Sequence, residues 1–187
     1  MAKPTENRLL YDRGQGYAGR VTSDHTLRHI AKDVVRIGRL GTFGFPKGYL
    51  LYVGSSFTHE GVAGRTARHL GGTGPRLWGV DFLRGFAESV ELWWTHHGEK
   101  VECTWARALA GMPMCSCPAP LAGASDCQRC EPPIVEQRCP AHLFHTEKHP
   151  SIEAFVKQLG LSGSGGYEVH CYTAKQALAA AKGAKAT

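Results

Sequence analysis

The sequence lacks the features of a membrane-spanning or exported chain. It has no run of about 18 apolar residues, which a helix would need to cross a bilayer. Its first ten residues, MAKPTENRLL, lack the apolar segment of a signal peptide. Acidic residues are also scarce, with 16 Asp and Glu against 22 Lys and Arg, so the formal net charge is +6. We therefore expect a cytoplasmic protein, and the basic balance favours a polyanionic partner.

The sequence also lacks an internal repeat, and its 187 residues suit one domain with appendages. Hydrophobic residues make up 42% of the chain and charged residues 20%, which is typical of a globular protein. We expect a loose N-terminal segment over residues 1–23 and the domain over residues 24–160. A linker, a strand-like segment and an Ala/Lys-rich tail follow over residues 161–187. Residues 112–142 form a cysteine-rich insertion in the domain.

Hydrophobic periodicity predicts both helices and strands. Leu27, Ile30, Ala31 and Val34 recur at helical spacing and predict a helix over residues 24–36. The stretch GYLLYVG is apolar on both of its faces, which indicates a central strand covered on each side. Further strands are expected at VDFL, SVELWW and YEVHCY, and further helices at GVAGRTARHL, ECTWARALA and SIEAFVKQLG.

A basic cluster follows the GYLLYVG strand. Arg65 and His69 are four residues apart and therefore share one face of a helix. Arginine offers a fixed fork of donors that suits phosphate oxygens, and histidine can donate, accept or transfer a proton. A phosphate site is one interpretation of this pattern, and a solvated basic face on a surface helix is the other.

Glu102 stands at the start of the ECTWARALA helix. It heads an apolar stripe with Ala106 and Leu109, so its carboxylate should face the core. Such a carboxylate is costly unless it is paired or binds a metal ion. Mg²⁺ usually takes one or two carboxylates, and waters and substrate phosphates complete its shell. A Mg²⁺ or Mn²⁺ site is one interpretation, and the other is an N-terminal glutamate that interacts with the helix dipole.

The GYLLYVG strand carries two tyrosines, Tyr49 and Tyr52, which point to opposite faces. Tyr52 shares its face with Leu50 and Gly54. A phenol near a metal ion and an arginine could orient or deprotonate water, which makes both tyrosines catalytic candidates. The alternative is that each is a packing residue with a hydrogen-bonded hydroxyl.

The cysteine-rich insertion contains two short metal-ligand turns. Cys127 and Cys130 form a C-x-x-C turn, and Cys139 and His142 form a C-x-x-H turn. Three thiolates and one imidazole make a closed tetrahedral zinc site, which would order a loop with few apolar residues. Reduced structural cysteines or redox chemistry are the alternatives. Three further residues could replace one of these ligands: Cys115, Cys117 and His145.

Several short blocks of this sequence form an ordered pattern. RIGRLGTFGFPKGYLLYVGSS, GRTARHL, GVDFL, ECTWARALA, SDC and HLF follow one another in this order between residues 35 and 144. This pattern resembles the GIY-YIG nuclease superfamily, and it is closest to an uncharacterised branch described as endonuclease III-related. Ordered blocks are far more specific than any single tripeptide.

The resemblance implies an α+β domain in which helices flank a small mixed β-sheet that carries one active site. By the matching motif positions, Tyr52 helps to activate water, Arg65 stabilises the phosphate, His69 stands one turn further along, and Glu102 binds the metal. The implied activity is metal-assisted hydrolysis of phosphodiester bonds in DNA.

Three more basic residues, Lys47, Arg68 and Arg76, are expected to contact the nucleic acid. An inactive nucleic-acid-binding module is the alternative function. The family's first strand, with its Gly-x-Tyr motif, should precede Val34, where helical spacing predicts a helix instead. A zinc-stapled protein-interaction domain is a third possibility.

Overall fold

The protein has an α+β fold. The structure is a computed structural model, and it describes eight stretches of the chain: residues 21–30, 33–55, 61–71, 79–83, 86–97, 101–118, 141–161 and 168–183. Within these stretches, no helix has both the length and the apolar character needed to cross a membrane.

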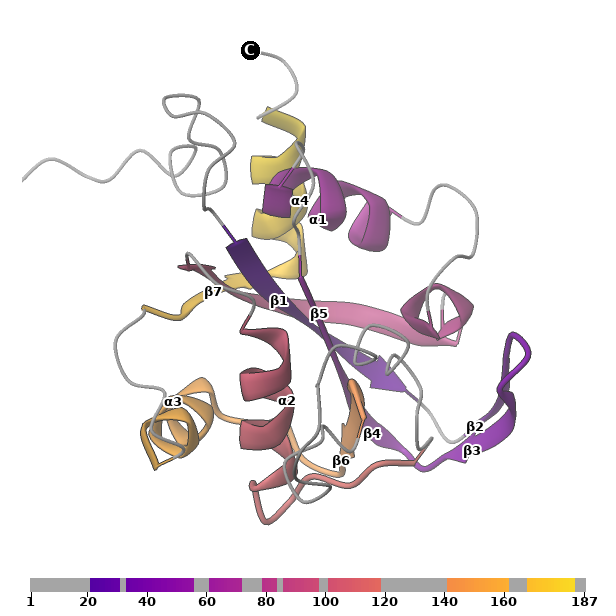
Figure 1. Cartoon of the computed structure of the whole chain (residues 1–187). Helices are drawn as coiled ribbons and strands as arrows, with labels where there is room; N and C mark the ends of the chain where they lie inside the picture. Colours follow the sequence, from indigo (N-terminus) through magenta and orange to yellow (C-terminus); the bar gives the residue numbers. More distant parts are fainter. Residues whose placement is uncertain are drawn as a thin grey trace, which may run out of the picture.

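A five-stranded sheet runs through the centre, with the strand order β6-β4-β1-β5-β7 (Figure 1). All four pairings between neighbouring strands are antiparallel, whereas the resemblance implied a mixed sheet. The strands are β1 (Val21–Ile30), β4 (Gly48–Ser55), β5 (Ala87–His97), β6 (Leu143–Thr146) and β7 (His170–Thr173).

The central strand β1 contradicts the helix predicted over residues 24–36. Residues 21–30 pair with β4 on one side and with β5 on the other, from Ser23 opposite Ser55 to Ile30 opposite Gly48. Pairing along both edges satisfies the backbone groups, and it overrides a helical spacing that rests on only four apolar residues. A strand therefore precedes Val34, where the sequence predicted a helix.

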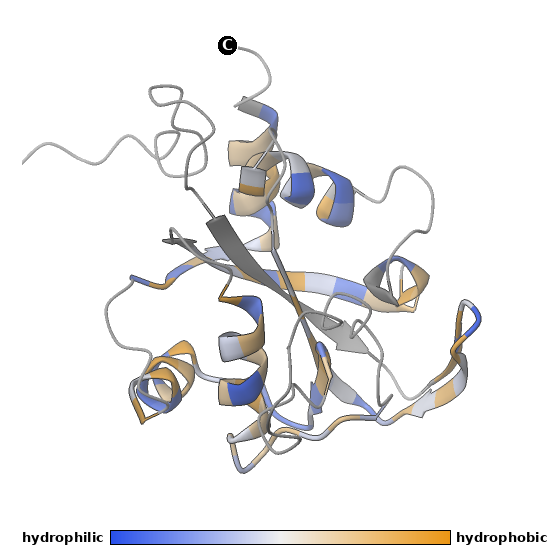
Figure 2. Cartoon of the chain, viewed as in Figure 1, coloured by the Kyte–Doolittle hydropathy of each residue, from blue (hydrophilic) through white to orange (hydrophobic). Residues whose placement is uncertain are grey.

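Strands β2 (Asp33–Ile37) and β3 (Gly41–Phe45) form a separate hairpin between β1 and β4. The hairpin lies at one end of the central sheet (Figure 1), and both hydrophilic and hydrophobic residues occur along it (Figure 2). Gly38 and Gly41 bound the turn with positive φ angles of 48° and 121°, which glycine adopts without strain. These glycines explain why GRLGTFGF folds back on itself.

Helices cover both faces of the central sheet (Figure 1). Helices α1 (Gly61–Gly71) and α4 (Ala174–Gly183) lie on one face, here called the α1 face. Helices α2 (Glu102–Ala110) and α3 (Ile152–Leu161) lie on the other, the α2 face.

Within the described residues, helices α1, α2 and α3 lie where the sequence predicts them. Ser151 caps α3, because its Oγ accepts a hydrogen bond from the Ala154 amide at 3.2 Å. One predicted strand is wrong, since GVDFL forms a 3-10 helix, η2 (Gly79–Leu83).

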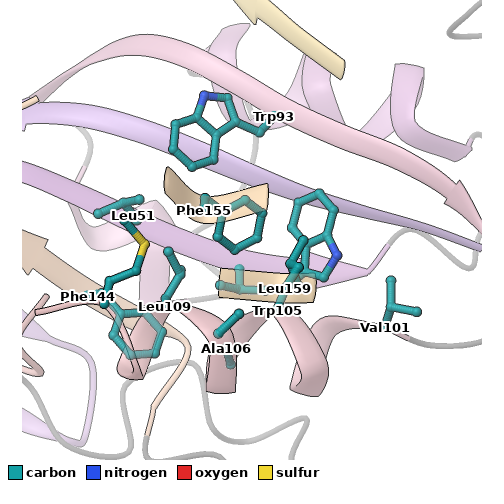
Figure 3. Packing of buried hydrophobic residues seen from close by; sticks show 12 residues of the cluster. Leu51, Trp93, Val101, Trp105, Ala106, Leu109, Phe144, Phe155 and Leu159 are labelled. Carbon is teal, nitrogen blue, oxygen red and sulfur yellow. The ribbon is translucent and has the colours of Figure 1, made fainter. Parts of the chain in front are cut away.

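The core on the α2 face is built around aromatic rings (Figure 3). Phe155 lies between Trp93 and Trp105, with ring centroids 5.4 Å and 5.0 Å away. Leu51 of β4 and Phe144 of β6 pack into the same cluster. These side chains are almost completely buried, so they attach α2 and α3 firmly to the sheet.

The C-terminal segment belongs to the same fold. Strand β7 pairs with β5 along the edge of the central sheet. Ala177 of α4 is buried in a cluster with Val62 of α1 and Trp94 of β5. The strand predicted at YEVHCY and the helical tail therefore pack directly against the domain.

Candidate functional site

Strand β4 carries Tyr52 and Gly54 on the α1 face. Successive side chains of a strand alternate between faces. Leu50 and Tyr52 accordingly belong to one buried cluster, while Leu51 and Val53 belong to the core on the α2 face. The prediction that Tyr52 shares a face with Leu50 and Gly54 is confirmed. Only 3% of Tyr52 is exposed.

Arg65 of α1 lies directly over Gly54. Its Nη1 donates a hydrogen bond to the backbone oxygen of Ser55 at 3.0 Å. A Cβ atom placed on Gly54 would lie 1.8 Å from Nη2, so only glycine leaves room for this guanidinium. The guanidinium carbon is 5.9 Å from the centre of the Tyr52 ring, within the usual cation–π range. Arg65 is 7% exposed, which contradicts the alternative of a solvated basic face.

His69 lies one helical turn after Arg65 and faces the same cluster. Its ring centre is 6.3 Å from that of Tyr52. With the proton on Nδ1, His69 donates a hydrogen bond to Asp81 Oδ1 at 3.2 Å, and both side chains are 1% exposed. The buried carboxylate therefore fixes the ring orientation of His69 and favours the tautomer with its proton on Nδ1.

Asp81 is the residue that the sequence analysis missed at this site. The expected strand at VDFL gave its carboxylate no role. In the structure Asp81 lies in η2, and its carboxylate is buried against His69. The available signal was a single acidic residue between apolar neighbours, because a carboxylate in such surroundings requires a partner.

Glu102 approaches β4 from the α2 face. It opens α2, where Val101 and Ala106 share a buried cluster with Val53 of β4. In Figure 3, Leu109 lies beside Leu51 and Val101 lies at the far end of α2. The first turn of α2 therefore lies near Val53 on the α2 face of β4. The Arg65 guanidinium lies over the next residue, Gly54, on the α1 face.

The Glu102 carboxylate is buried, as its position in the sequence predicts. Glu102 is 3% exposed, and among the described residues its Oε2 atom has no hydrogen-bond partner. The structure thus brings Tyr52, Arg65 and His69 together, and it places Glu102 on the other side of the same strand.

Tyr49 does not join this group. It lies on the α2 face, where its ring meets that of His149 edge-on at 5.1 Å. His149 Nε2 is 3.3 Å from Glu91 Oε1, and Trp93 Nε1 donates a hydrogen bond to Glu91 Oε2 at 2.9 Å. Tyr49 is therefore part of a second polar cluster, away from Arg65.

The predicted nucleic-acid contacts occupy different positions. Lys47 is exposed between β3 and β4, and Arg68 is partly exposed on α1. Arg76 lies outside the described residues.

The predicted zinc ligands are mostly outside the described part of the chain. This is true of Cys127, Cys130 and Cys139. His142 is buried next to β6, and its backbone oxygen accepts a hydrogen bond from Val53 at 2.8 Å. No group of three or more metal-ligating side chains occurs among the residues that the structure does describe.

The three spare zinc ligands separate in the structure. Ser116 pairs with His145 in an antiparallel bridge, and His145 pairs with Leu50. Cys115 and Cys117 flank Ser116 and pack against the core on the α2 face, so they lie on the other side from His145. Burial and the neighbouring Cys117 raise the pKa of Cys115 to about 11, and burial also raises the pKa of Cys117.

Comparison with known proteins gives one match. A family model described as a domain of unknown function, DUF123, matches residues 26–162, which is more than half of the chain, and the protein therefore belongs to this family. No curated protein and no solved structure matches the sequence. The matched region runs from β1 to α3 and includes the cluster around Arg65, whereas β7 and α4 lie beyond it.

Proposed function

We propose that this protein is a metal-dependent endonuclease that hydrolyses phosphodiester bonds in DNA, in the manner of the GIY-YIG nucleases that it resembles. The observation that supports this proposal is the buried group of Tyr52, Arg65 and His69 on one face of β4. A guanidinium suits a phosphate, and a phenol beside an imidazole suits the handling of a proton from water.

Each side chain of this group has a distinct role in the proposed reaction. Arg65 binds a phosphate oxygen and neutralises the negative charge that grows in the transition state. Tyr52 lies against the guanidinium, and its hydroxyl orients the attacking water. His69 donates its Nδ1–H in the hydrogen bond to Asp81. Nε2 is therefore the nitrogen that can take a proton from the water.

Glu102 is the residue that would bind Mg²⁺ or Mn²⁺. Its buried Oε2 atom, which has no hydrogen-bond partner in the described stretches, is an oxygen that a cation would stabilise. One protein carboxylate suffices for Mg²⁺, since waters and substrate phosphates complete the shell. When bound, the metal withdraws charge from the phosphate and from the leaving group.

A non-catalytic nucleic-acid-binding module is the second candidate. It is favoured by the position of Glu102 on the α2 face, opposite the group of Tyr52, Arg65 and His69. In this function the basic groups bind phosphate, and no bond is broken.

A cleavage assay with Mg²⁺ or Mn²⁺ on single-stranded and double-stranded DNA separates the two functions. The endonuclease predicts metal-dependent cleavage, which Glu102→Gln abolishes and Arg65→Ala lowers by about 10²–10³ in kcat. Glu88→Gln and Arg107→Ala make the same chemical changes at exposed positions and should leave the rate unchanged. Salt-sensitive binding without cleavage would instead identify the binding module.

We further propose a structural zinc ion held by Cys127, Cys130, Cys139 and His142 in a cytoplasmic protein. Three thiols and one imidazole are the donor set of a closed tetrahedral zinc site. A reducing compartment keeps such thiols available to the metal.

A further inference from the structure

The β2–β3 hairpin has a buried inner face. Val35, Ile37 and Phe45 are each 1% exposed and share one cluster with Leu50 and Tyr52 of β4. This packing fixes the hairpin to the strand that carries Tyr52. A hairpin packed in this way keeps a fixed position relative to Tyr52, Arg65 and His69, here called the Arg65 group.

The outer face of the hairpin is exposed and carries one basic residue, Arg36. It consists of two cross-strand pairs, Val34 with Gly44 and Arg36 with Thr42, and all four residues are exposed. A Cβ atom on Gly44 would meet no atom within 4 Å, and the φ angle of Gly44 is not positive. Neither space nor backbone conformation therefore requires glycine here, but its absence of a side chain lets another molecule approach the ribbon closely.

The charge of the hairpin has one dominant sign. Over residues 33–45 it carries Arg36 and Arg39 against the single acid Asp33, which gives a net charge of +1, and Lys47 follows directly after it. The three basic residues are exposed. Basic residues also protect a strand edge from aggregation. That role does not account for the apolar Val34 and Leu40, which are 63% and 50% exposed.

We propose that the outer face and the turn of this hairpin bind duplex DNA in the major groove. A two-stranded ribbon fits the major groove of B-DNA, which is about 12 Å wide, whereas the major groove of A-form RNA is too narrow for side chains to read. Arg36 and Arg39 supply the positive charge, and Thr42 and Gly44 permit close contact. The inference rests on the proposed function and deepens it. It names duplex DNA as the nucleic acid that the protein binds, and it assigns this binding to the hairpin, a surface separate from the Arg65 group.

The test measures binding without catalysis. Fluorescence anisotropy with a labelled 20-base-pair duplex in EDTA reports affinity alone. We expect Gly44→Glu and Arg36→Glu each to weaken binding by about tenfold or more, and Arg36→Ala to lower the slope of log K against log salt by about 1. Arg107→Glu, at an exposed position of α2, makes the same charge change as Arg36→Glu away from the hairpin and should leave affinity within about twofold. Unchanged circular dichroism and thermal melts would show that the variants are folded.

The outcomes separate this inference from the proposed function. Hairpin variants that bind like the wild type would overturn the inference, and so would a wild type that binds no duplex DNA. Equal losses on duplex RNA and single-stranded DNA would also overturn it, since a groove contact predicts a loss specific to B-form duplex. If binding depends on the hairpin while no DNA is cleaved with Mg²⁺ or Mn²⁺, the inference stands and the endonuclease proposal fails. If the wild type cleaves DNA but the hairpin variants keep full affinity, the endonuclease proposal stands and the hairpin inference fails.

Discussion

Gly54→Ala tests the geometry on which the candidate site depends. The added Cβ would lie 1.8 Å from Arg65 Nη2 and 2.6 Å from the guanidinium carbon, and real Cβ contacts are not shorter than 3.0 Å. The guanidinium must therefore move by at least 1.2 Å, and its 3.0 Å hydrogen bond to Ser55 cannot persist. The φ angle of Gly54 is not positive, so the backbone itself tolerates alanine.

The loss of a hydrogen bond from a charged donor costs about 1.5–3 kcal/mol. For a chain of this length, that cost lowers the melting temperature by about 3–12 °C. Urea unfolding and calorimetry measure the change in the free energy of unfolding. Gly44→Ala is the matched control, because a Cβ at that position meets no atom within 4 Å and should change stability by less than about 0.5 kcal/mol.

A double-mutant cycle makes the test specific to Arg65. In the Arg65→Ala background, Gly54→Ala should cost almost nothing, because the group that it displaces is absent. The endonuclease proposal adds that Gly54→Ala lowers cleavage nearly as much as Arg65→Ala does. Equal costs of Gly54→Ala with and without Arg65, or an alanine variant as stable as the wild type, would refute the placement of this guanidinium.

Three further predictions follow from other parts of the chain. Asp81→Asn removes the charge that faces His69 and should lower the free energy of unfolding by about 1–3 kcal/mol in urea titrations, while the exposed Glu88→Gln should not. Elemental analysis of the purified protein should find about one zinc per chain, and a metal-free protein whose melting ignores a chelator would contradict the zinc proposal. The raised pKa of Cys115, about 11, favours the neutral thiol in the fold, so its contribution to stability is complete below pH 9 and is lost as pH rises from 9 to 11. Cys115→Ala should reduce that alkaline loss in stability measured across this range, and an identical pH profile would contradict it.

Local sequence determined most of the helices. Helix α2 spans Glu102–Ala110 and α3 spans Ile152–Leu161, close to the limits set by their apolar stripes and by the Ser151 cap. These signals act within one or two turns, so the sequence alone contains them. The strand β4 was equally clear, because it is apolar on both faces and buried on both.

Tertiary pairing decided the centre of the sheet. Strand β1 has a weak helical pattern, and its conformation depends on hydrogen bonds to β4 and β5, which lie 18 or more residues further along the chain. A pattern within residues 24–36 carries no information about such partners. The same limit applies to β7, whose place at the sheet edge is set by β5.

The sequence by itself determined which side chains could form a phosphate site, since Arg65 and His69 share a helical face and Tyr52 faces the same way as Gly54. Only the tertiary structure decided which of them meet. It set Arg65 over Gly54, paired His69 with Asp81, and directed Glu102 to the opposite face of β4. Spacing along the chain fixes the direction of a side chain within its own element, whereas the distance between elements depends on how they pack.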